Sequence, residues 1–150
     1  MNIGGKTRVD FGTLDLSADK GIGVVFVDLN GLKTANDSIG HNKGDEMLVS
    51  VASKITQVFE SKDIYRVGGD EFLVIVTDMD KEEFGEHFER LKSLSRIEGE
   101  PSFALGAHFD DTYKDIGKTM QIADKNMYIN KAEYYEANPD KDRRFPTGAI

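Results

Sequence analysis

A pair of adjacent glycines between two strand-like runs constrains the fold of this 150-residue chain more than any other feature. The segment DIYRVGGDEFLVIVT, residues 63–77, is rich in the β-branched and aromatic residues that favour strands. Gly68 and Gly69 predict a tight two-residue hairpin turn with positive φ and room for a ligand to approach, so the two runs pair antiparallel. Asp70 and Glu71 then lie at the mouth of the second strand, where two carboxylates repel each other unless a cation lies between them.

The spacing of apolar residues elsewhere predicts strands and helices in alternation. A continuous apolar run ending in an acid, GIGVVFVDL (21–29), is typical of a strand buried on both faces. Apolar residues three and four apart predict an amphipathic helix over 45–59, and DKEE at 80–83 is a capping-box variant. We further expect a loosely patterned short helix over 7–16, a polar loop and short helix through His41, a helix with Phe84, Phe88, Leu91 and Leu94 on one face, a strand over 102–109 and a long helix over 116–136.

This order of elements predicts an α/β (α+β) sandwich, in which helices pack on one mainly antiparallel sheet. The length suits one domain, over residues 1–136, with a single core. Residues 137–150, ANPDKDRRFPTGAI, have no period and two prolines, which predicts a flexible tail.

Composition excludes several classes of function. The 27 acids outnumber the 19 basic residues, giving a net charge of −8, so we expect no nucleic-acid partner. A nucleoside triphosphate remains compatible if a divalent cation accompanies it. The absence of cysteine excludes a disulfide framework, a thiolate zinc site and a cysteine nucleophile. The chain shows no apolar run of about 18 residues and no signal-peptide pattern, so we expect no membrane contact by this domain and a cytoplasmic location.

Three acids occur where strands end or begin, and they predict a metal site. If the strand that ends at Asp28 pairs with the hairpin, this carboxylate meets Asp70 and Glu71 at one edge of the sheet. Mg²⁺ prefers such oxygen ligands and takes the remainder from phosphate and water. The alternative interpretation is an ordinary surface hairpin with solvated acids. A calcium loop opening at Asp28 is excluded, because its positions six and twelve hold Lys33 and Ile39.

The loop after the first strand, DLNGLKTANDSIGHNKGDEML (28–48), is dense in groups suited to a purine nucleotide. Backbone amides where the loop turns into a helix can bind phosphate, and an amide with a carboxylate suits the edge of guanine. The alternative interpretation makes these a cap, a first-turn acid and a solvated histidine. The candidate residues are Gly31, Leu32, Lys33, Asn36, His41 and Asp45.

Three blocks in order make the chain resemble the GGDEF family, the diguanylate cyclases. They are GGDEF (68–72) with Arg66 before it, VFVDLNGLKTANDSIGHNKGDEML (25–48) and ADKNMYINK (123–131), and the likeness runs from about 22 to 135. The resemblance implies a nucleotidyl-cyclase or polymerase-palm-like fold. It also implies a homodimer in which each domain holds one GTP, and each 3′-hydroxyl attacks the other α-phosphate to give cyclic di-GMP and two pyrophosphates.

The resemblance also implies a role for each matched residue. It implies two Mg²⁺ or Mn²⁺ ions per site, held by Asp28, the Leu29 carbonyl, Asp70 and Glu71, with Asp70 or Glu71 as the base. It implies that Asn36 and Asp45 bind guanine with His41 nearby, and that phosphates meet the amides of Gly31 and Leu32 together with Lys33 and Lys131. The family further implies an attached sensory or dimerising region, and a parent protein that can be anchored to a membrane.

Several positions depart from the family pattern. The opening MNIGGKTRVDF replaces a block like D-x-L-T-G-L-x-N-R, and Tyr135 stands where an arginine commonly follows Lys131. Phe59 and Lys62 occupy the R-x-x-D product-inhibition positions, so we expect no inhibitory site. The pair Gly31–Leu32 replaces a commoner aromatic-containing pair, which backbone contacts tolerate. Two alternatives stay open: a degenerate domain that binds GTP or a protein without turnover, and a transferase for another nucleotide.

Overall fold

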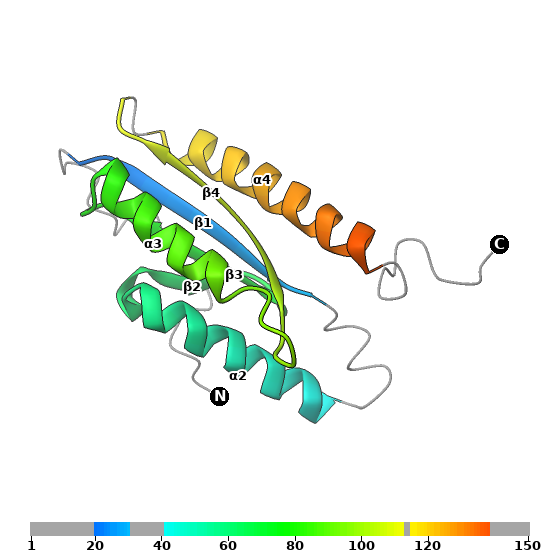
Figure 1. Ribbon diagram of the computed structural model, residues 1–150. Coiled ribbons are helices and arrows are strands. Elements are labelled where there is room, and N and C mark those ends of the chain that lie inside the picture. Colours follow the sequence, from blue (N-terminus) through cyan, green and yellow to red (C-terminus); the bar gives the residue numbers. More distant parts are fainter. Residues whose placement is uncertain (1–19, 31–40, 113–114, 139–150) are drawn as a thin grey trace.

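The protein is described by a computed structural model that covers residues 20–30, 41–112 and 115–138. Its centre is a four-stranded sheet in the order β2-β3-β1-β4 (Figure 1). Every pairing in it is antiparallel, as the hairpin and the strand pattern predicted. The strands are β1 (Ile22–Leu29), β2 (Ile64–Arg66), β3 (Glu71–Val76) and β4 (Phe103–Asp110).

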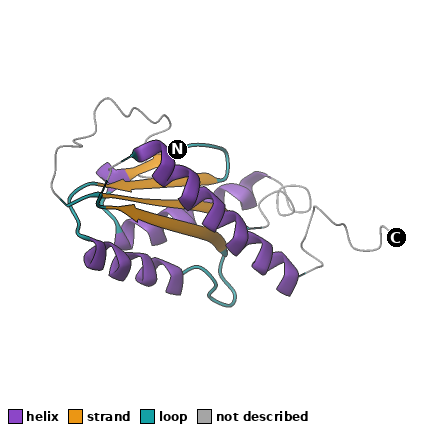
Figure 2. Ribbon diagram, turned by 90° about the horizontal axis from the view of Figure 1, so that it is seen from above, coloured by secondary structure: helices purple, strands orange, loops and turns teal. Residues whose placement is uncertain are grey.

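Helices cover both faces of this sheet, so the predicted sandwich is confirmed (Figure 2). The helices α2 (His41–Val58) and α3 (Lys81–Ser93) pack on one face, and α4 (Ile116–Ala137) packs on the other. A short 3₁₀ turn, η2 (Ser61–Asp63), precedes β2. None of the helices in the described part of the chain is long and apolar enough to cross a membrane.

Most boundaries agree with the sequence-based expectation to within one residue, and the start of α2 differs most. Helix α2 begins at His41, four residues before the expected start, because the apolar period begins only at Leu48 and the polar first turns carry no such signal. Helix α4 includes Ala137, the first residue of the expected tail. The expected helix over 7–16, the loop over 31–40 and residues 139–150 lie outside the described residues.

The central strand β1 is buried on both faces, as its continuous apolar run predicted. Val25, Val27 and Leu29 face the core under α2 and α3, whereas Val24 and Phe26 face α4. Because side chains alternate along a strand, Asp28 falls on the α4 face. The register of one strand thus decides which helix can reach this carboxylate.

Helix α4 packs against the bare backbone of β4. A Cβ atom added at Gly106 would clash with the amide nitrogen of Met127 and lie 2.5 Å from the carbonyl oxygen of Ala123. Only glycine permits this approach. The close contact fixes the height of α4 above the sheet, and with it the position of residues further along the helix.

Two asparagines of α4 also bind the outer edge of β4. Asn126 Nδ2 donates to the carbonyl oxygen of Ala107 at 3.0 Å, and the amide of Leu105 donates to Asn130 Oδ1 at 3.1 Å. The amide of Phe103 donates to the carbonyl of Ser95 at 3.0 Å. These bonds satisfy backbone groups of an edge strand that no further strand covers in the described sheet.

Helix α3 begins as its sequence predicted. Asp80 is its N-cap, and the Asp80 side chain accepts a hydrogen bond from the amide of Glu83 at 2.8 Å. Phe84 and Leu91 on its inner face are buried in the core, and Phe88 and Leu94 pack at the margin. This cap and apolar face seat α3 on the side of the sheet opposite α4.

Candidate active site

Asp28 and Glu71 meet at the end of β1 where β3 begins. They are directly opposite each other in the antiparallel pairing, and alternation places both on the α4 face of the sheet. The amide of Leu29 donates to the carbonyl oxygen of Asp70 at 3.0 Å, which ties the hairpin to the end of β1. The structure therefore brings together the three acids that the sequence singled out.

Lys131 joins this group from α4, the helix that covers this face of the sheet. Its Nζ donates to Asp28 Oδ2 at 2.6 Å, across 103 residues of sequence. The other oxygen, Oδ1 of Asp28, is buried and has no hydrogen-bond partner among the described residues. A buried carboxylate oxygen without a partner is unfavourable, and a bound cation would satisfy it.

Burial and mutual repulsion disfavour the charged forms of these acids. Burial raises the pKa of Asp28, Lys131 opposes that shift, and the charges of Asp70 and Asp124 add to it. Burial likewise raises the pKa of Glu71, and Asp28, Asp124 and Asp70 raise it further. A carboxylate whose pKa is raised is a better proton acceptor near neutral pH than an ordinary one.

The pKa of Lys131 is raised as well, and for a lysine this favours the charged form. Burial alone would lower the pKa of Lys131, but the hydrogen bond and the charge of Asp28 outweigh burial and raise it. The ammonium group therefore stays charged at neutral pH and offsets part of the negative charge around it.

Asp124 is a member of this group that the sequence reasoning missed. It lies on α4, and its charge acts on both Asp28 and Glu71. Asp124 and Lys131 are seven residues apart, close to two helical turns, so they share one face of the helix. That spacing within the block ADKNMYINK was the signal that would have found it.

The glycine turn differs from the expected two-residue hairpin. Four residues, 67–70, separate β2 from β3, and the amide of Val67 donates to the carbonyl of Glu71 at 3.0 Å. Among the described residues positive φ occurs at Gly21 and Gly99, so neither Gly68 nor Gly69 needs glycine for its φ. The longer turn relieves that need.

The side chain of Arg66 binds two backbone carbonyls of this turn. Its Nε donates to the carbonyl of Gly68 at 3.2 Å, and its Nη2 donates to the carbonyl of Gly69 at 2.9 Å. A Cβ added at Gly69 would meet no described atom within 4 Å. The position beside Asp70 is therefore open to a small side chain.

The other predicted site residues are placed unevenly. Asp45 is exposed on α2, and His41 is the first residue of that helix. Phe59 is buried in the core, whereas Lys62 is exposed and lies within 4 Å of carboxylates of Glu60, Asp63 and Asp78. Gly31, Leu32, Lys33 and Asn36 lie outside the described residues.

The donor set at Asp28 fits a hard divalent cation, although no ready cage is present. Among the described residues no group of three or more His, Asp or Glu side chains is arranged to hold a metal ion. Mg²⁺ does not require such a cage, because it commonly takes one or two carboxylates and completes its shell with phosphate and water. The free Oδ1 of Asp28 beside Glu71 matches that need.

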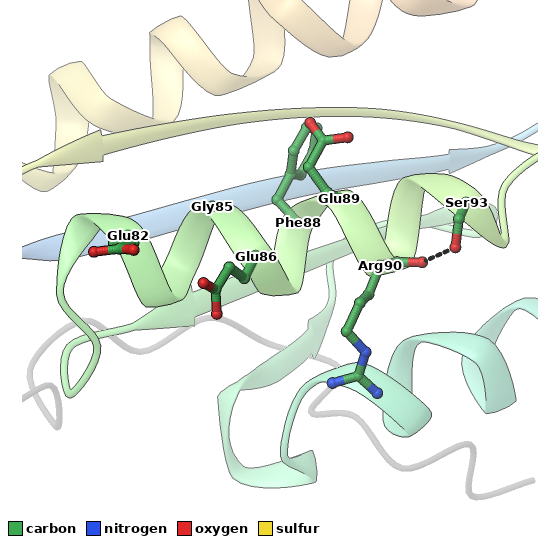
Figure 3. A pocket seen from close by; sticks show the side chains of 7 residues that line it. All are labelled: Glu82, Gly85, Glu86, Phe88, Glu89, Arg90 and Ser93. Atoms are coloured by element: carbon green, nitrogen blue, oxygen red, sulfur yellow. Dashed lines mark hydrogen bonds between the residues drawn. The ribbon is translucent and has the colours of Figure 1, made fainter.

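A surface depression beside α3 lacks the converging carboxylates of the candidate site. It is a shallow, open depression of about 740 Å³ along the outer surface of α3, and none of the site residues Asp28, Asp70, Glu71, Asp124 and Lys131 lines it. Figure 3 shows that the side chains of Glu86 and Arg90 extend from one side of α3, whereas those of Phe88 and Glu89 extend from the other. No set of groups converges there on a common point.

Comparison with known proteins agrees with the sequence motifs. The family described as "Diguanylate cyclase, GGDEF domain" matches residues 13–136. Diguanylate cyclase DosC of Escherichia coli (strain K12) is 33% identical over 120 residues, which cover 73% of this chain and 26% of DosC. Diguanylate cyclase DgcP of the same strain is 30% identical over 120 residues, covering 72% of this chain and 35% of DgcP. The chain thus spans only about a quarter to a third of these relatives.

Solved structures show the same fold. The GGDEF domain of TpbB, also named YfiN, from Pseudomonas aeruginosa superposes with a TM-score of 0.65 at 25% identity, covering 76% of this chain and 73% of that one. A microbial GGDEF domain described in an interaction with bis-(3,5)-cyclic di-GMP gives a TM-score of 0.63 at 28% identity, covering 79% and 80%.

Proposed function

This chain belongs to the GGDEF family of diguanylate cyclase domains, and we propose that it condenses two molecules of GTP into cyclic di-GMP and two pyrophosphates. The observation that carries the proposal is the pairing of Asp28 with Glu71 beside an unpartnered buried oxygen. Its named relatives DosC and DgcP are diguanylate cyclases, which supports the same activity here.

In the proposed reaction the 3′-oxygen of one GTP forms a bond to the α-phosphorus of the other, and pyrophosphate leaves. Asp70 or Glu71 accepts the proton of the 3′-hydroxyl, and the raised pKa of Glu71 suits it to that role. Asp28, the Leu29 carbonyl, Asp70 and Glu71 are the proposed ligands of Mg²⁺ or Mn²⁺, two ions per site. When bound, such ions neutralise the triphosphate and polarise the α-phosphate.

The remaining contacts to the nucleotide are proposed from the family resemblance. Guanine is bound by Asn36 and Asp45, with His41 nearby. The amides of Gly31 and Leu32, with Lys33 and Lys131, bind the phosphates. The open space at Gly69 supports an approach of the substrate along the glycine turn.

The reaction needs two GTP molecules face to face, so we propose that the active form is a homodimer. The named relatives are three to four times longer than the aligned segment, which supports an attached sensory or dimerising region in the parent protein. We place this domain, residues 1–136, in the cytoplasm, with any membrane anchor outside it.

A second candidate is a domain that binds GTP, or a protein partner, without turnover. Tyr135 stands where the family pattern commonly has an arginine, and this residue is 7% exposed. Lys131 in turn is bound to Asp28. With Tyr135 uncharged and Lys131 paired, the protein would hold the triphosphate weakly. GTP could then bind through its guanine without being positioned for reaction.

Incubation of the purified protein with GTP and Mg²⁺, followed by anion-exchange chromatography, tests the proposal. We expect cyclic di-GMP and pyrophosphate to form in a ratio of one to two, with a rate per protomer that rises with protein concentration. Folded protein that binds GTP in calorimetry but forms no cyclic di-GMP at high concentration would establish the second candidate instead. Competition by ATP as an alternative substrate would favour a transferase for another nucleotide.

A further inference from the structure

We propose that Lys131 is a resident counterion of Asp28: it neutralises this carboxylate in the metal-free protein and is displaced when a divalent cation binds, which releases it for phosphate. The inference rests on the proposed function, in that it assigns Asp28 to a metal. Beyond the proposed binding of phosphate by Lys131, it describes a metal-free state in which Lys131 is paired with Asp28, and a competition between Lys131 and the metal ion for this carboxylate.

The contact between the two side chains is short and partly enclosed. Lys131 Nζ lies 2.6 Å from Asp28 Oδ2, and the side chains are 23% and 13% exposed. A charge-assisted hydrogen bond of this length at low exposure is stronger than a surface ion pair. The lysine therefore occupies one of the two oxygens that a cation would use.

The Lys131 ammonium group and a divalent metal ion would repel each other if both were bound to Asp28. Four carboxylates act on the group, those of Asp28, Asp70, Glu71 and Asp124. Lys131 supplies the positive charge that opposes the raised pKa of Asp28 and of Glu71. A divalent ion bound to Asp28 would neutralise the group more fully, and it would repel an ammonium group a few ångströms away.

The side chain of Lys131 can move away from Asp28 without a change in the backbone. Its side chain is partly exposed, it extends from α4 on a flexible four-carbon stem, and its ammonium group donates to Asp28. Asp28 cannot move in the same way, because it is held in the register between β3 and β4. Displacement therefore moves the lysine and leaves the carboxylate in place.

Two consequences follow for binding. Without nucleotide, the metal competes with Lys131 and binds weakly. With a triphosphate present, the released ammonium finds a new anionic partner, so metal and nucleotide bind more tightly together than separately.

Acetylation of the wild-type protein tests the displacement without any substitution. Reaction with a limiting acylating reagent, read by mass spectrometry, gives the rate at Lys131 relative to Lys118 and Lys125, two exposed lysines on the same helix. We expect Mg²⁺ or Mn²⁺ without nucleotide to raise the relative rate at Lys131 several-fold. An unchanged or lower relative rate at saturating metal would overturn the inference.

Metal affinity tests the competition itself. We expect Lys131→Met to bind Mn²⁺ without nucleotide on the order of tenfold more tightly than wild type in calorimetry, since one opposite charge beside a carboxylate shifts its proton affinity by a factor of this size or more. Lys125→Met is the matched control and should bind as wild type does. Equal or weaker binding by Lys131→Met contradicts competition.

These outcomes separate the inference from the proposed function. Wild-type protein that makes cyclic di-GMP while neither measurement responds would overturn the counterion role alone. Metal-dependent exposure of Lys131 in a protein that makes no cyclic di-GMP would support the counterion role and refute the activity.

Discussion

Asp28 and Glu71 lie directly opposite each other on neighbouring antiparallel strands, with the amide of Leu29 hydrogen-bonded to the carbonyl of Asp70 next to them. Like charges in this position destabilise a sheet. The folded protein therefore holds a repulsive pair at its candidate site, and relief of that repulsion should be measurable apart from activity.

Glu71→Gln should abolish activity while it stabilises the metal-free fold. Loss of a base and of a metal ligand should lower the rate of cyclic di-GMP formation on the order of a hundredfold or more. Removal of the repulsion should raise the free energy of unfolding by about 0.5 kcal/mol in metal-free buffer. Both quantities are compared with those of Glu89→Gln, an exposed control on α3 outside its first turn, which should change neither. Retained activity in Glu71→Gln would remove this residue from the mechanism.

Gly106→Ala should separate α4 from the sheet, because the new methyl group would meet the backbone of Met127 and Ala123. We expect a loss of about 1–3 kcal/mol in the free energy of unfolding, together with lower activity, because Lys131 moves with the helix. Gly85→Ala is the matched control in the middle of α3, where a Cβ meets no described atom within 4 Å. That variant should gain about 0.5–1 kcal/mol from helix propensity. Urea denaturation of the two proteins measures both effects, and equal stabilities would contradict the packing argument.

Gly69→Ala should damage substrate binding and leave the fold intact. Its φ lies outside the left-handed region and a Cβ has space, so stability should change by less than about 0.5 kcal/mol. We expect weaker binding of a non-hydrolysable GTP analogue, by roughly tenfold, since the methyl group would occupy the approach to the turn. Gly99→Ala gives the mirror result: with φ at 85° it should lose about 1–2 kcal/mol of stability and bind the analogue normally. Unaltered binding by Gly69→Ala would place the substrate away from this turn.

Asp63 should make stability fall as the pH rises from about 4 to about 6. Burial, with the charges of Asp78 and Glu60 adding and Lys62 opposing, raises its pKa from 3.8 to about 6. Between these values the native state retains a proton that the unfolded chain has released, so ionisation above this window costs the native state free energy. Asp63→Asn should therefore be more stable than wild type near pH 7, by about 1–2 kcal/mol after discount for partial exposure, and equal to it near pH 4.

Denaturant titrations at both pH values measure this difference. Asp111→Asn, an exposed carboxylate after β4, is the control for general charge effects. The same pH dependence in Asp63→Asn as in wild type would show that other groups cause it.

The sequence predicted the sheet well because its signals were local. The continuous run ending at Asp28 predicted a doubly buried strand, and the apolar period predicted the face of α2. The places of the acids at strand ends predicted the group that the strand register brings together. The first turns of α2 escaped prediction because they carry no apolar residue on the buried face to mark them.

The sequence reasoning did not predict which partners individual side chains would bind. Glycine pairs are common in tight hairpins, so φ at Gly68 and Gly69 was expected to be positive; the guanidinium of Arg66 instead holds a longer turn. The ion pair of Lys131 with Asp28 joins residues 103 positions apart, and the role of Asp124 depends on the same docking of α4. The pairing of Lys131 with Asp28 follows from tertiary packing, whereas the seven-residue spacing of Asp124 and Lys131 was a local signal that the sequence reasoning did not use.

The asparagines that bind the outer edge of β4 have a consequence for how two copies can associate. An uncovered edge strand normally invites another chain to extend the sheet, but here Asn126 and Asn130 already engage the backbone of Ala107 and Leu105. A second molecule that added a strand there would first have to break both contacts. These two contacts therefore oppose the growth of continuous intermolecular sheets from the β4 edge.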